Sequence, residues 1–294
     1  MASVRVGELQ IEYDRQGKGE PILLVMGIGA QMIFWPEGFC ERLAARGFEV
    51  IRFDNRDVGL STHLRGVRTE PVPVLLAKSA LRRPVRAPYT LSDMADDSVG
   101  LLDALGFRSA HVVGVSMGGM IAQMMAITHP SRVRSLTSIM SGTGDWRSLF
   151  VRPKALRALL GPVPPDAETA GRKLEAFVRA VGGRHPHDWA LTRALGRRAF
   201  ERAQNPAGFV RHLAAIAATG DRTGALRFLR TPTLVLHGTL DPLIPPLNGR
   251  ATARAIPGAR LHLLEGMGHD LPEALWKEMV DLITQHAHAA GRAG

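Results

Sequence analysis

The hydrophobic positions of the chain form short continuous runs that alternate with longer stretches of helical periodicity. Residues 22–26 are apolar throughout and end at Gly27, which is typical of a strand buried on both faces of a sheet. Residues 36–46 then show a helical pattern that stops at Gly47. Strands are predicted in this way at 11–13, 22–26, 50–53, 111–115, 133–140, 233–237 and 260–264.

Helices are predicted between these strands, and their alternation determines the fold class. They lie at 36–46, 92–105, 117–128, 246–255 and 272–286. Ser92 is the expected N-cap of the second helix, whereas 57–90 is rich in proline and arginine and is expected to be irregular. Strands that alternate with helices predict an α/β fold with a mostly parallel, doubly wound sheet.

One block interrupts this alternation. Residues 144–220 show helix-like segments separated by Pro and Gly turns, without a strand pattern. We interpret the block as a helical cap inserted into an α/β core, which leaves 1–143 as the first part of the core and 221–294 as the second. Functional residues of such sheets gather at the carboxyl ends of the strands, so candidates are sought there.

Composition and charge restrict the possible partners. The 294 residues are 45% hydrophobic, which is enough for a full core. The net charge is +10, and residues 151–230 hold 15 Lys and Arg against 6 Asp and Glu. Because no aromatic interleaving or reading motif accompanies this charge, we expect no nucleic-acid partner. An arginine-rich solvated surface is the favoured interpretation, and a basic rim that attracts anionic substrates is the alternative.

The single cysteine and the absence of long apolar runs bear on the location of the protein. Cys40 is expected to be a packed thiol, and one cysteine excludes an intrachain disulfide, which suits a reducing cytoplasm. We expect neither a signal peptide nor a membrane span, and therefore a cytoplasmic location. The oligomeric state stays open between monomer and homodimer.

The strongest candidate for chemistry is Ser116, in the run Gly-Val-Ser-Met-Gly at 114–118. An apolar strand precedes the serine and a helix follows it, which is the context that a Gly-x-Ser-x-Gly nucleophile requires. The turn is tight enough that side chains two positions away would meet neighbouring backbone, hence Gly114 and Gly118. The alternative is a glycine-rich turn that contains a serine by chance.

A serine hydroxyl needs a base, and His269 is the best of the 11 histidines. It follows the strand at 260–264 by a short loop, which places it at a carboxyl end. The alternative is a surface loop histidine. The other histidines that we considered are expected in a supporting position beside the site (His237), in strands (His111, His262), in the cap (His185, His187) or in a frayed tail (His286, His288).

The imidazole in turn needs a carboxylate. Asp241 follows the strand at 233–237, and the order Ser, Asp, His is the one expected for this type of sheet. The alternative is that Asp241 only begins an Asp-Pro turn. Asp145, which follows the strand at 133–140, is the rival acid.

Acyl transfer also needs hydrogen-bond donors for the developing oxyanion. We expect the backbone N–H groups of Met117 and of Ile28, in the glycine-containing loop after 22–26, to supply them. Pocket walls are expected from the cap and from Met32 and Trp35, although core packing explains those two side chains equally well.

These motifs together resemble the α/β-hydrolase superfamily over nearly the whole chain outside the cap. The segments that carry the resemblance are 23–29, 53–61, 114–118, 237–242 and 266–269. The chain is most similar to bacterial esterases of the aclacinomycin methylesterase type, which share a Val-Met-Gly strand end and an Asp-x-Arg-Asp-x-Gly-x-Ser run. Compared with the wider superfamily, Met26 replaces a frequent histidine, Asn55 stands between Asp54 and Arg56, and Asp57 replaces the usual glycine.

The resemblance implies hydrolysis of a small-molecule carboxylic ester without cofactor or metal. It carries over Ser116, Asp241 and His269 as a triad, with Ile28 and Met117 as oxyanion donors. The 54–61 run is expected to brace the loop beside the oxyanion strand. The alternatives are a perhydrolase or C–C bond hydrolase that uses the same triad, and a ligand-binding receptor on a hydrolase scaffold. The presence of Ser116 argues against dehalogenases and epoxide hydrolases, which need aspartate there.

Overall fold

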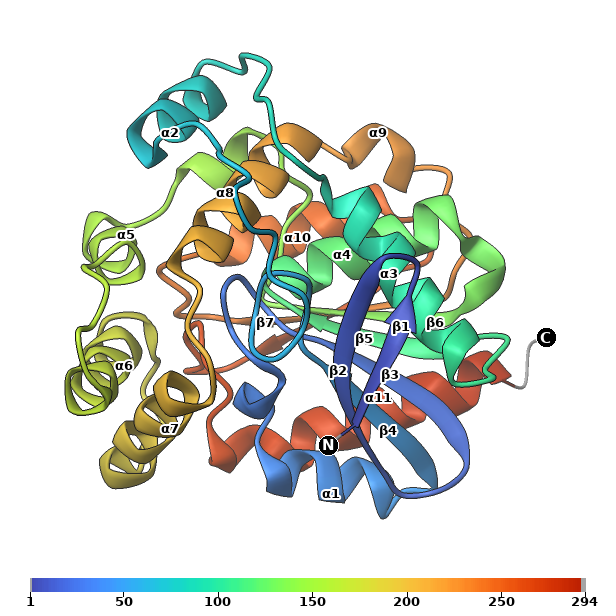
Figure 1. The fold of residues 1–294 in the computed structure, drawn as a ribbon. Helices are drawn as coiled ribbons and strands as arrows, with labels where there is room; N and C mark the ends of the chain where they lie inside the picture. Colours follow the sequence, from blue (N-terminus) through green and yellow to red (C-terminus); the bar gives the residue numbers. More distant parts are fainter. Residues whose placement is uncertain (1, 292–294) are drawn as a thin grey trace.

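A computed structural model describes residues 2–291, and within them the strands form one mixed sheet of eight strands (Figure 1). The order is β1-β2-β4-β3-β5-β6-β7-β8; β1 and β2 pair antiparallel with their neighbours, and the remaining pairs are parallel. The strands are β1 Ala2–Val6, β2 Leu9–Gln16, β3 Glu20–Val25, β4 Phe48–Phe53, β5 Ala110–Val115, β6 Val133–Ile139, β7 Thr233–Gly238 and β8 Arg260–Leu264.

Helices cover both faces of this sheet, which confirms the predicted doubly wound α/β class. In Figure 1, α1 and α11 lie below the sheet, and α3, α4 and α10 lie above it. The helices are α1 Glu37–Ala44, α2 Val72–Ala80, α3 Leu91–Ala104, α4 Met117–Thr128, α5 Pro153–Leu159, α6 Ala167–Val181, α7 Trp189–Arg202, α8 Pro206–Thr219, α9 Thr223–Leu226, α10 Pro246–Ala255 and α11 Trp276–Gly291, with short 3-10 turns at Met32–Phe34, Pro130–Arg132, Trp146–Leu149 and Glu273–Leu275.

The central strands explain why their sequences are continuously apolar. Leu23 and Val25 of β3 pack into the core below α3 and α4, whereas Ile22 and Leu24 pack into the core above α1 and α11. Both faces of the strand are therefore removed from water, so neither face needs polar side chains. Cys40 is fully buried in the second of these cores, where desolvation raises the pKa of its thiol to about 12, in agreement with the expected packed thiol.

The segment between β6 and β7 runs through α5, α6, α7, α8 and the short α9. The first three lie at the left of Figure 1, beside the helices that flank the sheet, and α6 packs along α7. Within residues 2–291, no helix combines the length and the apolar character needed to cross a membrane.

Three local predictions were wrong. The stretch 57–90 contains α2, because proline is tolerated in the first turn of a helix, where its missing N–H has no intrahelical partner. Helix α3 is capped by Thr90 and not by Ser92. His286 does not lie in a frayed tail: it is buried in α11, with Nε2 3.2 Å from the Leu136 oxygen.

The start of α3 is held by a reciprocal pair of hydrogen bonds. The Thr90 hydroxyl accepts from the Asp93 N–H at 3.4 Å, and the Asp93 carboxylate accepts from the Thr90 N–H at 2.7 Å. Each bond satisfies a backbone donor that has no partner inside the helix. The Ser92 backbone N–H instead donates to the Thr90 hydroxyl at 3.2 Å.

Thr90→Ala is expected to lower the free energy of unfolding by about 1 kcal/mol, because it removes this cap. Ser92→Ala, two residues further along in the first turn of α3, is the matched control and is expected to change this free energy by less than about 0.5 kcal/mol. Urea denaturation of both variants measures the difference. Equal losses in the two variants would contradict the assignment of the cap to Thr90.

Candidate active site

Ser116 occupies the turn between β5 and α4 in a backbone conformation that non-glycine residues rarely adopt. Its φ is 54° and its ψ is −121°. The Ser116 N–H donates to the Ile139 oxygen at 2.9 Å, and the Ser141 hydroxyl donates to the Ser116 oxygen at 2.7 Å. These bonds from β6 and the loop after it hold the serine in a strained conformation that aims its side chain out of the sheet.

The two glycines of the motif are required by close contacts within this turn. A Cβ on Gly114 would lie 2.1 Å from the Gly118 oxygen, and a Cβ on Gly118 would lie 2.0 Å from the Val25 oxygen. Both distances are far below van der Waals contact. The turn therefore closes only when both positions lack a side chain, as the sequence predicts.

The structure brings Ser116, His269 and Asp241 together in one hydrogen-bonded chain. The Nε2 atom of His269 lies 3.0 Å from the Ser116 Oγ, and its Nδ1 atom lies 2.7 Å from the Asp241 Oδ2. Because a carboxylate only accepts, we assign the ring proton to Nδ1, which leaves Nε2 free to accept the serine proton.

The second oxygen of Asp241 fixes the orientation of the carboxylate. Oδ1 accepts from the N–H groups of Leu243 at 2.9 Å and Ile244 at 2.8 Å. His237 supports the same loop, since its Nε2 lies 2.7 Å from the Ile244 oxygen. Its ring is fully buried, and desolvation lowers its pKa, so it is uncharged at neutral pH.

The rival acid, Asp145, lies elsewhere in the hydrogen-bond network. Its Oδ1 accepts from the Arg147 N–H at 2.9 Å, at the start of the 3-10 turn Trp146–Leu149, and its other oxygen pairs with the Arg147 guanidinium. The structure therefore joins His269 to Asp241.

The loop that carries His269 is covered by the chain that leaves α6, a contact that we did not predict. The His269 N–H donates to the Val181 oxygen at 2.7 Å, and the Arg184 N–H donates to the Gly266 oxygen at 2.7 Å. A Cβ on Gly268 would lie 2.2 Å from the Val181 oxygen. The predicted base is therefore positioned partly by the segment between β6 and β7.

His187, from the same segment, contacts the residue next to the predicted base. Its Nε2 lies 2.9 Å from Asp270 Oδ2, and both side chains are mostly buried. Desolvation raises the pKa of Asp270. A hollow of about 210 Å³ opens beside this pair, lined by Val178, Arg179, Gly182, Gly183, His185, His187 and Trp189.

The two predicted oxyanion donors lie on elements that meet at Ser116. Met117 is the first residue of α4, so its N–H belongs to the positive end of the helix dipole. On the other side, a Cβ on Gly27 would lie 3.3 Å from the Ser116 Cβ, which places the loop that contains Ile28 directly beside the serine.

The 54–61 run contacts this loop, which confirms its predicted bracing role. Asp54 Oδ1 accepts from the Met32 N–H at 2.7 Å, and the Asn55 amide donates to the Met26 oxygen at 3.0 Å. Both residues are buried.

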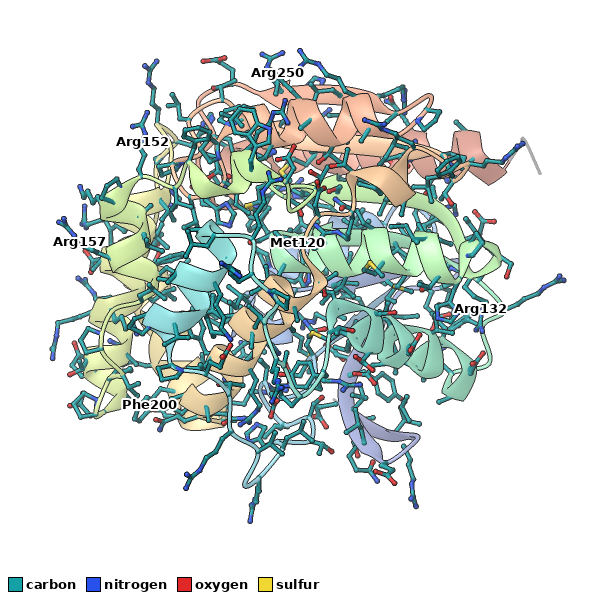
Figure 2. The ribbon with its side chains drawn as sticks, turned by 90° about the horizontal axis from the view of Figure 1, so that it is seen from above. Met120, Arg132, Arg152, Arg157, Phe200 and Arg250 are labelled. Atoms are coloured by element: carbon teal, nitrogen blue, oxygen red, sulfur yellow. The ribbon has the colours of Figure 1, made fainter. Side chains whose placement is uncertain are left out.

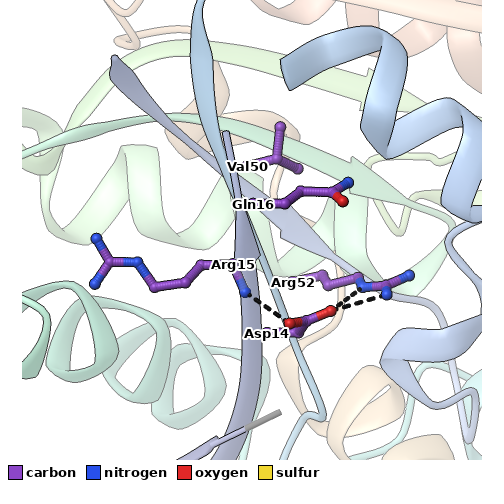
Figure 3. A pocket seen from close by; sticks show the side chains of 5 residues that line it. All are labelled: Asp14, Arg15, Gln16, Val50 and Arg52. Carbon is purple, nitrogen blue, oxygen red and sulfur yellow. Dashed lines mark hydrogen bonds and ion pairs between the residues drawn. The ribbon is translucent and has the colours of Figure 1, made fainter. Parts of the chain in front are cut away.

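Met32 and Trp35 do not line an open cavity. Both side chains are 0% exposed, and Trp35 stacks on Phe39 with ring centroids 5.8 Å apart. The predicted pocket role is wrong for these residues in this structure, because the chain after Ala30 turns into the core. A second hollow, over β2 and β4, is lined by Asp14, Arg15, Gln16, Val50 and Arg52 and contains none of the predicted site residues (Figure 3).

The arginine excess of 151–230 proves to be of two kinds. Arg152 and Arg157 extend outward at the left of Figure 2, as expected for a solvated surface. Arg211 and Arg222, by contrast, are buried at 3% and 4% exposure, and Arg211 pairs with Asp57. The interpretation as a solvated surface is therefore wrong for these two arginines, which hold polar partners inside the protein.

No group of three or more His, Cys, Asp or Glu side chains in the described part of the chain is arranged to hold a metal ion. The hydrogen-bonded chain from Ser116 through His269 to Asp241 can carry a proton from the serine hydroxyl to the imidazole.

The sequence model of a family described as alpha/beta hydrolase fold matches residues 20–273. The chain belongs to the α/β-hydrolase family. Its relatives include rhodomycin D methylesterase of Streptomyces peucetius, 31% identical with 92% of this chain and 91% of the relative covered. Another is 2-hydroxymuconate semialdehyde hydrolase of Pseudomonas putida, 29% identical with 86% and 82% covered.

Among solved structures, the meta-cleavage product hydrolase of Pseudomonas fluorescens IP01 superposes with a TM-score of 0.74. The match covers 99% of this chain and 98% of that one at 19% identity. At this identity the likeness supports the α/β-hydrolase fold alone.

Gly118→Ala is expected to lower the free energy of unfolding by about 3 kcal/mol or more, because its Cβ would collide with backbone. Gly224→Ala is the control, since a Cβ on Gly224 meets no atom within 4 Å, and it is expected to change stability by less than about 1 kcal/mol. Denaturant unfolding monitored by circular dichroism compares them. A Gly118→Ala protein as stable as the control would contradict the packing described here.

Proposed function

We propose that the chain is a serine hydrolase that cleaves carboxylic esters through an acyl-enzyme on Ser116. The observation that carries this proposal is the Ser116–His269–Asp241 chain, with links of 3.0 and 2.7 Å. Three side chains from distant parts of the sequence meet at the carboxyl ends of parallel strands, in the geometry that serine nucleophiles need.

The expected cycle uses residues in roles that their contacts permit. The Ser116 Oγ attacks the ester carbonyl while its proton passes to His269 Nε2, and the carbonyl electrons move to the oxygen. The Ile28 and Met117 N–H groups stabilise this oxyanion. The carbon–oxygen bond to the alcohol then breaks, and His269 protonates the departing alcohol. Asp241 holds the imidazole and stabilises its positive charge.

Water completes the reaction. It attacks the acyl carbonyl and gives a proton to His269 Nε2. A second oxyanion forms in the same hole and collapses, which breaks the bond to Ser116 and returns the proton to Oγ. The carboxylic acid then leaves and the free enzyme is restored.

The relatives and the helices beside the site support a substrate class. The methylesterase relative covers nearly the whole chain, which favours methyl esters of larger carboxylic acids. We assign 144–220 as the cap over the core formed by 1–143 and 221–294, because its chain contacts the loop of His269. The cap therefore bounds the space into which the acyl or alcohol group extends.

A C–C bond hydrolase that uses the same triad is the second candidate. It is favoured by the 2-hydroxymuconate semialdehyde hydrolase relative, which covers 86% of this chain. Product analysis after incubation with a methyl ester and with a vinylogous β-diketone acid separates the two. Turnover of the diketone acid alone would replace the esterase proposal.

Ser116→Ala is expected to abolish turnover of p-nitrophenyl esters and stoichiometric labelling by a fluorophosphonate, because the attacking oxygen is absent. The assay compares ester hydrolysis and probe incorporation for the wild-type and variant proteins. Undiminished ester hydrolysis in the variant would overturn the proposed function.

Asp241→Asn is expected to lower kcat by about 10²- to 10⁴-fold, because an amide can donate to Nδ1 and favour the wrong tautomer of His269. Asp145→Asn tests the rival acid and is expected to keep kcat within about threefold, since asparagine preserves the turn cap. Steady-state kinetics with one ester measures both variants. The reverse order of effects would transfer the role to Asp145.

A further inference from the structure

We propose that His212, on α8, is a positioning residue for the oxyanion loop. It holds the Gly29 N–H and thereby keeps the neighbouring Ile28 N–H directed at the space beside Ser116. The inference deepens the proposed function and rests on it.

His212 bridges two loops through both nitrogens of its ring. The Gly29 N–H donates to Nδ1 at 3.2 Å, and Nε2 lies 2.8 Å from the Arg56 oxygen. An amide N–H only donates and a carbonyl oxygen only accepts, so the proton must reside on Nε2 and Nδ1 must be bare. The ring is fully buried, and desolvation lowers its pKa to about 4, so the neutral form persists at neutral pH.

The bond to the Gly29 N–H matters because another hydrogen bond already fixes the preceding peptide unit, which joins Gly27 to Ile28. The Ala30 N–H donates to the Gly27 oxygen at 3.3 Å. In a trans peptide the N–H points opposite to the carbonyl oxygen, so the Ile28 N–H is directed away from Ala30. The bond from the Gly29 N–H to His212 fixes the next peptide unit, which joins Ile28 to Gly29. With both of its peptide units held, Ile28 has no freedom to rotate.

Gly29 itself could not hold this conformation alone. Its φ of 61° lies in the left-handed region, and glycine is flexible enough to leave it when nothing constrains the loop. A Cβ on Gly29 would lie 2.7 Å from Cδ2 of Phe209, which shows that this ring packs directly on the loop. Phe209 and His212 are three residues apart on α8 and therefore share the helix face that meets Gly29.

Helix α8 is itself anchored by a buried ion pair. The Arg211 guanidinium donates to both carboxylate oxygens of Asp57, at 2.7 and 2.6 Å, and the Tyr89 hydroxyl donates to one of them at 2.7 Å. Burial alone would raise the pKa of Asp57, but the bonds from Arg211 and Tyr89 hold it below its usual value, so the carboxylate stays charged. Breaking this pair would leave a buried charge without its partner, which is strongly destabilising. The pair therefore holds α8 firmly in place.

Asp57 is the residue that departs from the usual glycine of this motif, and the ion pair explains the departure. Its φ is 67°, a strained value for a residue with a side chain. Its carboxylate also accepts from the Leu64 N–H at 2.8 Å. Aspartate at this position therefore strains the backbone locally, but its ion pair with Arg211 fixes α8. Helix α8 in turn places His212 against the oxyanion loop.

A second tie fixes the residues that follow the loop. The Gln31 side chain donates to the Ala199 oxygen of α7 at 2.7 Å, and Arg202 Nη1 donates to Gln31 Oε1 at 2.9 Å and to Asp54 Oδ2 at 2.6 Å. The loop is thus held from α8 at Gly29 and from α7 at Gln31.

Three substitutions separate the acceptor at Nδ1 from the donor at Nε2. His212→Phe keeps the ring volume and removes both contacts. His212→Asn keeps an oxygen near the position of Nδ1, which can accept from Gly29. His212→Gln keeps an amide near the position of Nε2, which can donate to Arg56. The measurement is kcat and KM on a p-nitrophenyl ester, normalised to active sites counted by complete fluorophosphonate labelling, with thermal unfolding of each protein.

We expect His212→Phe to lower kcat per active site about 10- to 100-fold with KM within about twofold, because an oxyanion contact acts in the transition state. His212→Asn is expected to recover kcat to within about fivefold of wild type, and His212→Gln to resemble His212→Phe. The order of the three variants in kcat is expected to differ from their order in unfolding temperature.

Equal recovery by Asn and Gln, or a kcat loss that only follows the unfolding temperature, would show that His212 is a purely structural residue. If His212→Phe does not fold, the Asn and Gln variants decide the question.

Ser116→Ala, assayed in parallel, keeps the two proposals apart. Ester hydrolysis that survives this change overturns the proposed function, whereas normal kcat in His212→Phe with an inactive Ser116→Ala overturns only the role of His212.

Discussion

The contact between the Val25 oxygen and the backbone of Gly118 is the constraint on which the site depends. A Cβ on Gly118 would lie 2.0 Å from that oxygen, so the end of β3 and the first turn of α4 touch without a side chain between them. The same approach brings the loop after β3 beside Ser116, where a Cβ on Gly27 would lie 3.3 Å from the serine Cβ. Ser116 and the loop that contains Ile28 are thus arranged by one backbone contact.

The parts of the site that follow from local pattern and sheet topology could be predicted. Ser116 lies between a strand and a helix whose signals are strong in the sequence, and α4 has the predicted bounds. Asp241 and His269 could be selected because parallel strands present their carboxyl ends at one edge. The capping box at Thr90 could also have been predicted, since Asp93 follows three residues later. Ser92 is an equally good cap by residue type, and the sequence does not decide between the two.

The remaining contacts depend on how distant segments dock, which no local pattern encodes. Arg211 and Asp57 are 154 residues apart, and nothing in the periodicity of either segment joins them. The contact of Val181 with the His269 loop is of the same kind. The net charge of 151–230 also gave a wrong prediction for Arg211 and Arg222. The sequence pattern of an amphipathic helix is the same whether its arginine faces water or a buried carboxylate.

The docking of Val181 on the His269 N–H has a consequence for how such enzymes can be recombined. A chimera joined at the ends of 144–220 would replace the acceptor of the His269 N–H together with the proposed cap. It would also separate Arg211 from Asp57, its ion-pair partner in the core. Under the proposed function, the cap and the geometry of His269 would be inherited as one block, and a productive crossover would have to carry residue 57 along with α8.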